Sequence, residues 1–127
     1  MTTLTVLAIC LAGGVGASAR LVLDGVIRTR VRATYPVATT AINLTGSLLL
    51  GLLAGLAAAQ LLPHSVQLIA GTGLLGGYTT FSTASFETVR LLEDRRYVAA
   101  AVNGVGVLVV ATAVAAAGYA TMLAVVS

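Results

Sequence analysis

The residues that could do chemistry in this chain are amides and hydroxyls set inside long apolar stretches. Asn43 lies well inside the stretch 37–62, and Thr39 and Ser47 stand four residues to either side of it. Residues four apart share one face of a helix, so the three polar groups form one stripe. An amide in hydrocarbon needs hydrogen-bond partners. Two uses stay open: Asn43 holds helices together, or it lines a water-filled path and donates to an anion.

A second polar run, GGYTTFST at 76–83, interrupts the apolar stretch 65–91. Paired glycines weaken a helix, and the hydroxyls of the run need hydrogen-bond partners at membrane depth. A helix broken there would free main-chain carbonyl oxygens, which some transporters use to hold Na⁺. The alternative is a continuous helix whose hydroxyls bond to their own carbonyl groups. The hydroxyls are those of Thr79, Thr80, Ser82 and Thr83.

Isolated side chains complete the set of candidates. Phe81 lies within the polar run, and its ring either packs in the bilayer or turns its positive edge toward a small anion. Arg20 lies near the end of the first apolar stretch, where a charge usually faces protein or water. It either anchors that stretch at the interface or draws anions into a polar vestibule. Cys10 and His64, one of each type, leave no disulfide framework and no metal cluster.

Composition identifies the elements that must hold these groups. The chain has 127 residues, of which 58% are hydrophobic and 9% are charged. Soluble domains carry about 25% charged residues, so the deficit predicts an integral membrane protein formed by a single domain, residues 1–127. A spanning helix needs about 20 apolar residues. Four stretches qualify: Leu4–Leu23, Val37–Leu62, Ser65–Leu91 and Tyr97–Val126.

The basic residues are arginines, and their placement predicts the orientation of the helices. All 7 favour the side of the connectors 28–36 and 92–96, and none lies at the termini or in the connector 62–65. By the positive-inside rule the arginine-rich side is cytoplasmic and both termini are outside. The arginines flank apolar stretches, so no nucleic-acid binding is expected. Residues 17–19 resemble a signal-peptide cleavage site, but no basic residue precedes the apolar run, so we expect this segment to be retained.

Three motifs together resemble those of the Fluc (CrcB) family of small fluoride channels. The first stretch has G-x-x-G-A-x-x-R, the second P-x-x-T-x-x-x-N-x-x-G, and the third G-x-x-G-G-x-T-T-F-S-T. Their order, the length of the chain and the four expected spans agree with the family, so the resemblance covers the whole chain. The matching residues are Gly13, Gly16, Ala17 and Arg20, then Pro36, Thr39, Asn43 and Gly46, and finally Gly73, Gly76, Gly77, Thr79, Thr80, Phe81, Ser82 and Thr83.

The resemblance implies an all-α membrane protein whose third helix is broken near its middle, assembled as an antiparallel dual-topology dimer in the plasma (inner) membrane. It implies a fluoride-specific ion channel that exports fluoride passively and relieves its toxicity. It also implies a structural Na⁺ ion, not transported, held by main-chain carbonyls of Gly76 and Thr79. The pore residues it assigns are Asn43, Phe81, Thr80, Ser82 and Thr83, and Arg20 and Thr39 take vestibule or structural roles.

Two departures from the family pattern concern the aromatic residues and the arginines. The family usually reads TTFSTF, but Ala84 stands in place of the second ring, and Phe86 would point about 200° away from it on a helix. The usual Tyr and Ser pair, four residues apart, is also missing from the last span, where Asn103 and Thr112 are the candidates. The arginine bias, in turn, conflicts with insertion in both orientations.

Both departures lead to one hypothesis about the partner. The chain is one half of a heterodimer, and a homologous sister of opposite orientation supplies a full aromatic pair in at least one pore. Alone, the chain would then conduct partly or not at all. The alternative is a homodimer that tolerates Ala84.

Other classes of function fit these residues less well. A proton-coupled drug exporter of similar size needs a carboxylate inside the membrane, whereas the four acidic residues here fall near span ends: Asp24, Glu87, Glu93 and Asp94. A membrane scaffold would explain the glycines but leave Asn43 and the TTFST run without a purpose. An enzyme is not expected, because no nucleophile has a base within reach by sequence and no phosphate-binding loop or metal set is present.

Overall fold

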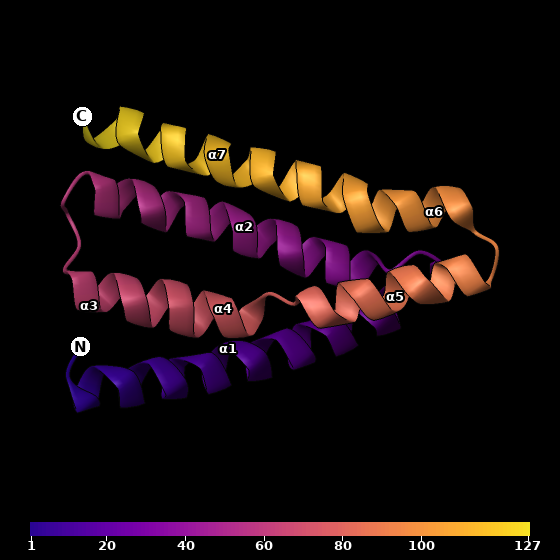
Figure 1. Ribbon diagram of the computed structural model, residues 1–127, viewed down its shortest axis with the longest axis horizontal. Helices are drawn as coiled ribbons and strands as arrows, with labels where there is room; N and C mark the ends of the chain where they lie inside the picture. Colours follow the sequence, from indigo (N-terminus) through magenta and orange to yellow (C-terminus); the bar gives the residue numbers. More distant parts are fainter.

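The computed structural model describes residues 1–127, most of them helical and none in a strand. The long helices run side by side, with both termini and the α2–α3 turn at one end and the α1–α2 and α5–α6 connections at the other (Figure 1). The elements are α1 Thr3–Arg30, α2 Val37–Ala58, α3 His64–Gln67, the π-helical η1 Leu68–Leu75, α4 Gly76–Tyr78, α5 Phe81–Glu93, α6 Tyr97–Ala101, the π-helical η2 Val102–Gly106 and α7 Val107–Val126.

Three helical segments are long and apolar enough to cross a membrane, judged by length and composition: Thr3–Arg30, Val37–Ala58 and Tyr97–Val126. The first, second and fourth expected spans correspond to them. The third expected span is divided into α3, η1, α4 and α5. Its crossing of the membrane, and with it the count of four spans, stays a prediction.

The apolar side chains of the chain face outward. Only 14 of the 127 residues are buried, and the exposed ones include Leu4 and Leu11 on α1 and Leu108 on α7. The surface of the bundle is largely hydrophobic, whereas soluble proteins rarely expose wide apolar patches. Such a surface suits contact with lipid, as the sequence predicts for a multi-pass membrane protein.

Helix α1 is longer than the expected span, which ended at Leu23. It continues to Arg30, so two of the arginines expected in the connector lie on the helix instead. Arg28 Nε donates to Asp24 Oδ2 at 2.8 Å, an ion pair between residues four apart that supports another helical turn. Cations in a last turn also interact favourably with the helix dipole.

The turns after α2 and α5 are built alike. In each, a non-glycine residue adopts a positive φ, 58° at Gln60 and 57° at Arg95. The next N–H then reaches back into the helix, from Leu61 to Leu56 O at 3.0 Å and from Arg96 to Leu91 O at 2.9 Å. This is the Schellman ending of a helix. It stops α2 at Ala58, four residues before the expected end of the second span.

Glycines allow the backbones of paired helices to touch. A Cβ added to Gly16 of α1 would overlap the carbonyl oxygen of Leu74, and one added to Gly51 of α2 would overlap that of Ala115 on α7. Small residues at such contacts are the usual means of packing helices in lipid, where the hydrophobic effect does not drive helices together. Two helix pairs, α1 with η1–α4 and α2 with α7, therefore form the frame of the bundle.

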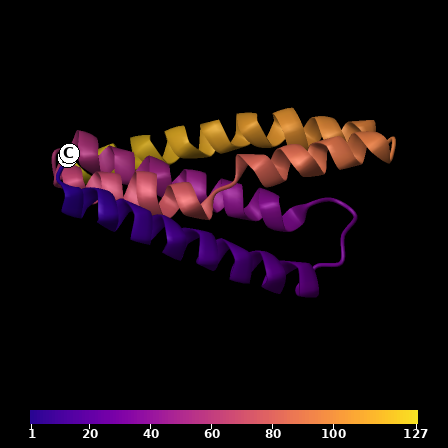
Figure 2. The ribbon, with the colours of Figure 1, turned by 60° about the horizontal axis from the view of Figure 1, so that its bottom comes forward.

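The break in the third span lies later than expected. Gly76 and Gly77 are helical, as part of α4, and the extended residues are Thr79 and Thr80. Gly77 is instead a packing residue, because an added Cβ would overlap the carbonyl oxygen of Gly13. The chain steps sideways at the break, so that α5 lies beside α6 (Figure 2).

This packing makes a prediction about two neighbouring glycines of α1. Gly16→Ala should destabilise the protein by about 1–3 kcal/mol, because the added methyl group forces the backbones of α1 and η1 apart. Gly14→Ala is the matched control, since its Cβ meets nothing within 4 Å and alanine favours the helix. Thermal unfolding in detergent measures both variants. An equal loss of stability in the two would contradict the close approach.

Candidate functional site

One side-chain amide closes the break in the third span. Asn43 Nδ2 donates to the carbonyl oxygen of Thr80 at 2.9 Å, and Asn43 Oδ1 accepts from the N–H of Thr80 at 2.9 Å. The amide of α2 thus takes the N–H of Thr80, which would bond the carbonyl of Gly76 in an unbroken helix, and it adds a bond to the carbonyl of Thr80, the N-cap of α5. Of the two uses left open for Asn43, the holding of helices is observed.

The hydroxyls that follow the break start the next helix. Thr80 Oγ1 accepts from the N–H of Thr83 at 3.2 Å and donates to Thr83 Oγ1 at 3.0 Å, so Thr80 is the N-cap of α5. Ser82 is exposed, and its Oγ lies 3.4 Å from Thr80 Oγ1. Much of the polar run therefore serves the local fold, as side-chain caps do wherever a helix begins inside a protein.

A cavity of about 530 Å³ opens beside the break, between α2, η1, α5, η2 and the start of α7. Three of the five expected pore residues line it, Asn43, Thr80 and Phe81, whereas Ser82 and Thr83 do not. The expected cation residues Gly76 and Thr79 line it as well. Its wall contains no charged side chain, and its other polar side chains are those of Ser47, Ser85, Thr88 and Asn103.

Most of the polar side chains in this cavity have no donor to spare. Ser85 donates to Phe81 O at 2.9 Å, Thr88 to Ala84 O at 2.8 Å, and Thr79 to Leu75 O at 2.9 Å. An asparagine amide has two N–H groups, and Asn43 uses one of them on Thr80. The second N–H of Asn43 and the hydroxyl of Ser47, which bonds no protein group, are therefore the free donors on the α2 side of the cavity.

The aromatic side chains stand out from the surface of the chain. Phe81 is 84% exposed and lies at the cavity, and Phe86 is 67% exposed and does not line it. Ala84 does line it, one helical turn after Phe81. The cavity thus has one ring and a methyl group where the family pattern has two rings.

Asn103 ties α5 to the last long helical segment. It is 3% exposed, and its Nδ2 donates to Ala84 O at 3.1 Å and to Thr88 Oγ1 at 2.9 Å. It lies in the π-helical turn η2. The sequence signal for Asn103 was a polar side chain inside an apolar stretch, and the same signal pointed to Thr112. That residue is exposed and donates only to Leu108 O of its own helix at 2.8 Å.

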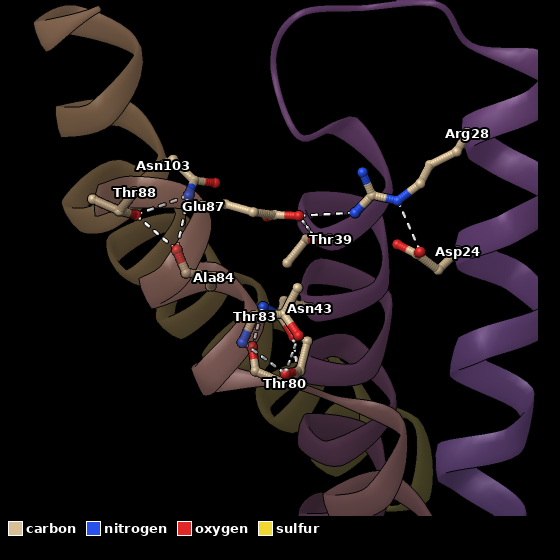
Figure 3. A network of polar contacts seen from close by, with 10 residues as sticks. All are labelled: Asp24, Arg28, Thr39, Asn43, Thr80, Thr83, Ala84, Glu87, Thr88 and Asn103. Atoms are coloured by element: carbon tan, nitrogen blue, oxygen red, sulfur yellow. Dashed lines mark hydrogen bonds and ion pairs between the residues drawn. The ribbon is translucent and has the colours of Figure 1, made fainter. Parts of the chain in front are cut away.

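A polar cluster that the sequence did not predict joins α1, α2 and α5 (Figure 3). Glu87 Oε1 accepts from Arg28 Nη2 at 2.8 Å and from Thr39 Oγ1 at 2.9 Å, and Arg28 also binds Asp24. The hydroxyl of Thr39 is thus committed to a carboxylate, and Thr39 is 1% exposed, so its role here is structural. Glu87 Oε2 is buried and accepts no hydrogen bond.

Arg20 lies away from the large cavity. Its Nε donates to the carbonyl oxygen of Gly77 at 3.4 Å, which links α1 to α4. The sequence predicted an anchor at the membrane interface or a charge in a vestibule, and this contact instead gives Arg20 a structural link between helices. It also brings a positive charge next to the C-terminal end of α4, where the helix dipole favours cations.

The main-chain oxygens at the break suit a hard cation. In a continuous helix the carbonyl of Gly76 would accept from the N–H of Thr80, but that N–H donates to Asn43. No side chain donates to the carbonyl oxygen of Gly76 or Thr79, and both residues line the cavity. Carbonyl oxygens freed by an unwound helix are ligands that Na⁺ accepts. The residues present therefore fit the expected Na⁺ ion.

The family match and the similar proteins all point to one family. Residues 7–119 match the family described as CrcB-like protein, Camphor Resistance (CrcB). The chain is 55% identical over 118 residues to a protein of Leifsonia xyli subsp. xyli named fluoride-specific ion channel FluC 1, covering 93% of this chain and 86% of the relative. It is 45% identical to FluC 2 of Mycobacterium bovis, covering 92% of both chains, and 45% identical to FluC 3 of Bifidobacterium longum, covering 89% and 96%. The chain belongs to the CrcB family.

Proposed function

We propose that this chain forms a fluoride-specific ion channel that lets fluoride leave the cytoplasm passively and so lowers its toxic concentration. The observation that carries the proposal is the uncharged cavity at the helix break, which offers free donors and a ring but no carboxylate. The relatives are likewise named as fluoride-specific ion channels. A proton-coupled exporter is not favoured, because the two acidic side chains of the polar cluster, Asp24 and Glu87, are both paired with Arg28 and neither lines this cavity.

The chemistry of the cavity suits a small, strongly hydrated anion. A selective pore replaces the water around an ion with groups of the protein. The second N–H of Asn43 and the hydroxyl of Ser47 lie four residues apart on one face of α2, so they offer successive donors along one line. The positive edge of the Phe81 ring offers a further attraction. We place the fluoride path along this face, with Thr80 positioned beside it.

A single chain leaves this path open on one side. Phe81, which is 84% exposed, would face water or lipid, although the proposal needs it to enclose an ion. We propose that a second chain covers the cavity in an antiparallel dimer. Its carbonyl oxygens would join those of Gly76 and Thr79 around a structural Na⁺ ion that is not transported.

We further propose that the partner is a homologous sister chain. Arg96 Nη1 donates to Thr34 O at 2.7 Å, so the connectors 31–36 and 94–96 meet at one end of the bundle. This end carries the arginines of both connectors, and the end with the two termini carries none. By the positive-inside rule we propose that the arginine-rich end faces the cytoplasm, and we propose the plasma (inner) membrane as its location. An antiparallel partner then needs the opposite arginine pattern, and Ala84 leaves a ring for it to supply.

Removal of the free donors should reduce fluoride flux. Asn43→Ala and Ser47→Ala should each lower efflux from liposomes by about tenfold or more, the loss expected for one hydrogen bond to an ion. Ser47→Ala is the cleaner variant, because no protein hydrogen bond is lost with it. Asn43→Ala also unpairs Thr80, so its dimer assembly is checked by size-exclusion chromatography.

Thr45→Ala is the matched control for these two variants. Thr45 lies on the same helix but outside the cavity, where its Oγ1 contacts the hydroxyl of Tyr78 at 2.9 Å. Its flux should stay within about twofold of the parent, since no hydrogen bond to the ion is lost. Unchanged flux in both Asn43→Ala and Ser47→Ala would contradict a fluoride path along this face of α2.

Removal of Na⁺ should inactivate the channel slowly. An ion that binds only the folded assembly stabilises it, so exchange of Na⁺ for N-methylglucamine should lower both the flux and the midpoint of thermal unfolding of the dimer. Restored Na⁺ should recover both. Equal stability and flux in the two buffers would discard the carbonyl site at Gly76 and Thr79.

The partner proposal is tested with the chain alone. Purified without a sister, it should give weak fluoride efflux, and Ala84→Phe should raise that efflux by restoring a ring to the cavity wall. Co-expression with a homologue that has arginines on the opposite connectors should also restore flux. Robust efflux from a chain shown by crosslinking to be an antiparallel homodimer would overturn the sister chain while leaving the channel function intact.

A further inference from the structure

We propose that a second, smaller cavity binds the headgroup of an anionic phospholipid. It has a volume of about 250 Å³ and lies between the end of α1 and the start of α2. Its wall includes Arg28, Arg32 and Tyr35, with Ile27 and Val31 as apolar neighbours. It shares no lining residue with the large cavity, so it lies outside the proposed fluoride path.

The charge of this cavity is set by Arg32. Arg28 also lines it, but its Nε and Nη2 are each 2.8 Å from a carboxylate oxygen, of Asp24 and Glu87. Arg32 makes no ion pair within the chain. A guanidinium presents several donors in a fixed fork that matches the oxygens of a phosphate group. The unpaired charge of Arg32 therefore selects an anion with this geometry.

The wall of the cavity is held in place by contacts from several elements. Arg96 Nη1 donates to Thr34 O at 2.7 Å, which fixes the connector from the α5–α6 turn. The N–H of Val31 donates to Ile27 O at 2.7 Å, and the N–H of Val37 donates to Tyr35 O at 2.8 Å. A site whose shape exists before the ligand arrives avoids the cost of ordering a loop on binding.

The surroundings favour a lipid over a soluble phosphate. Val31 lines the cavity and is 44% exposed, and on the same face one and two turns earlier lie Ile27, which also lines the cavity, and Leu23, which is 36% exposed. The headgroup phosphate would lie at Arg32 while the acyl chains cover this apolar strip of a membrane-spanning helix. Basic pockets beside spanning helices commonly bind anionic headgroups in this way.

The test compares lipid retention by three forms of the full-length channel. Native mass spectrometry after detergent exchange counts phosphatidylglycerol and phosphatidylcholine bound to the parent, to Arg32→Gln and to Arg30→Gln. Arg30 is the matched control, because it is exposed, lies two residues away and does not line the cavity. Arg32→Gln should retain about fivefold less phosphatidylglycerol, and Arg30→Gln should match the parent. If both variants lost phosphatidylglycerol equally, the lipid would be attracted by the basic connector in general, and the proposed site would be overturned.

A second variant tests the cavity without a change of charge. Ala33→Trp, on the wall, should fill the cavity and reduce phosphatidylglycerol retention to the level of Arg32→Gln. Unchanged retention would overturn the proposal. Competition with inorganic phosphate at millimolar concentration distinguishes a lipid headgroup from a free phosphate ion. If phosphate displaces phosphatidylglycerol from the parent protein, the cavity is a site for soluble anions. Fluoride efflux from phosphatidylcholine liposomes reports on the channel separately, because the lipid site does not rest on that function.

Discussion

The amide of Asn43 bonds both main-chain groups of Thr80, and this pair of contacts lets the third span stop and restart inside the bundle. A broken helix at membrane depth is tolerated only where its freed backbone groups find partners. Because Asn43 takes the N–H of Thr80, the carbonyl of Gly76 loses its helical partner. The same exchange turns Phe81 into the first residue of a new helix, and it creates the cavity wall that the proposed channel needs.

The sequence predicted the elements well where composition decides them. The long apolar stretches are one-dimensional signals, and three of them correspond to long helical segments. In the stripe on α2, Asn43 and Ser47 line the cavity, whereas Thr39 bonds Glu87. The break was placed too early because paired glycines look like helix breakers, yet a close contact with Gly13 keeps Gly77 helical. The cluster around Glu87 escaped prediction because it joins residues 48 and 59 positions apart. Such proximity depends on helix packing, which no local pattern records.

Most polar side chains near the helix break already donate their hydrogen bonds within the protein. The TTFST run suggested a row of hydroxyls for an anion, but Thr80 caps a helix and Thr79 donates to Leu75. What remains is the second N–H of Asn43 and the hydroxyl of Ser47, a residue that the motif did not emphasise. A strongly hydrated ion would then meet few donors per chain, which gives a physical reason for a second chain to complete the coordination.

The bundle is held by two kinds of contact that lie in different parts of the molecule. Backbones touch at Gly16 and Gly51, whereas the far end of α5 is held by the pairs around Glu87 and by Asn103. Salt screens exposed ion pairs strongly and partly buried ones much less. The Glu87 side chain is 12% exposed, and Asn103 is 3% exposed and uncharged. The attachment of the half-helix that bears Phe81 should therefore change little with the ionic strength of the surrounding water.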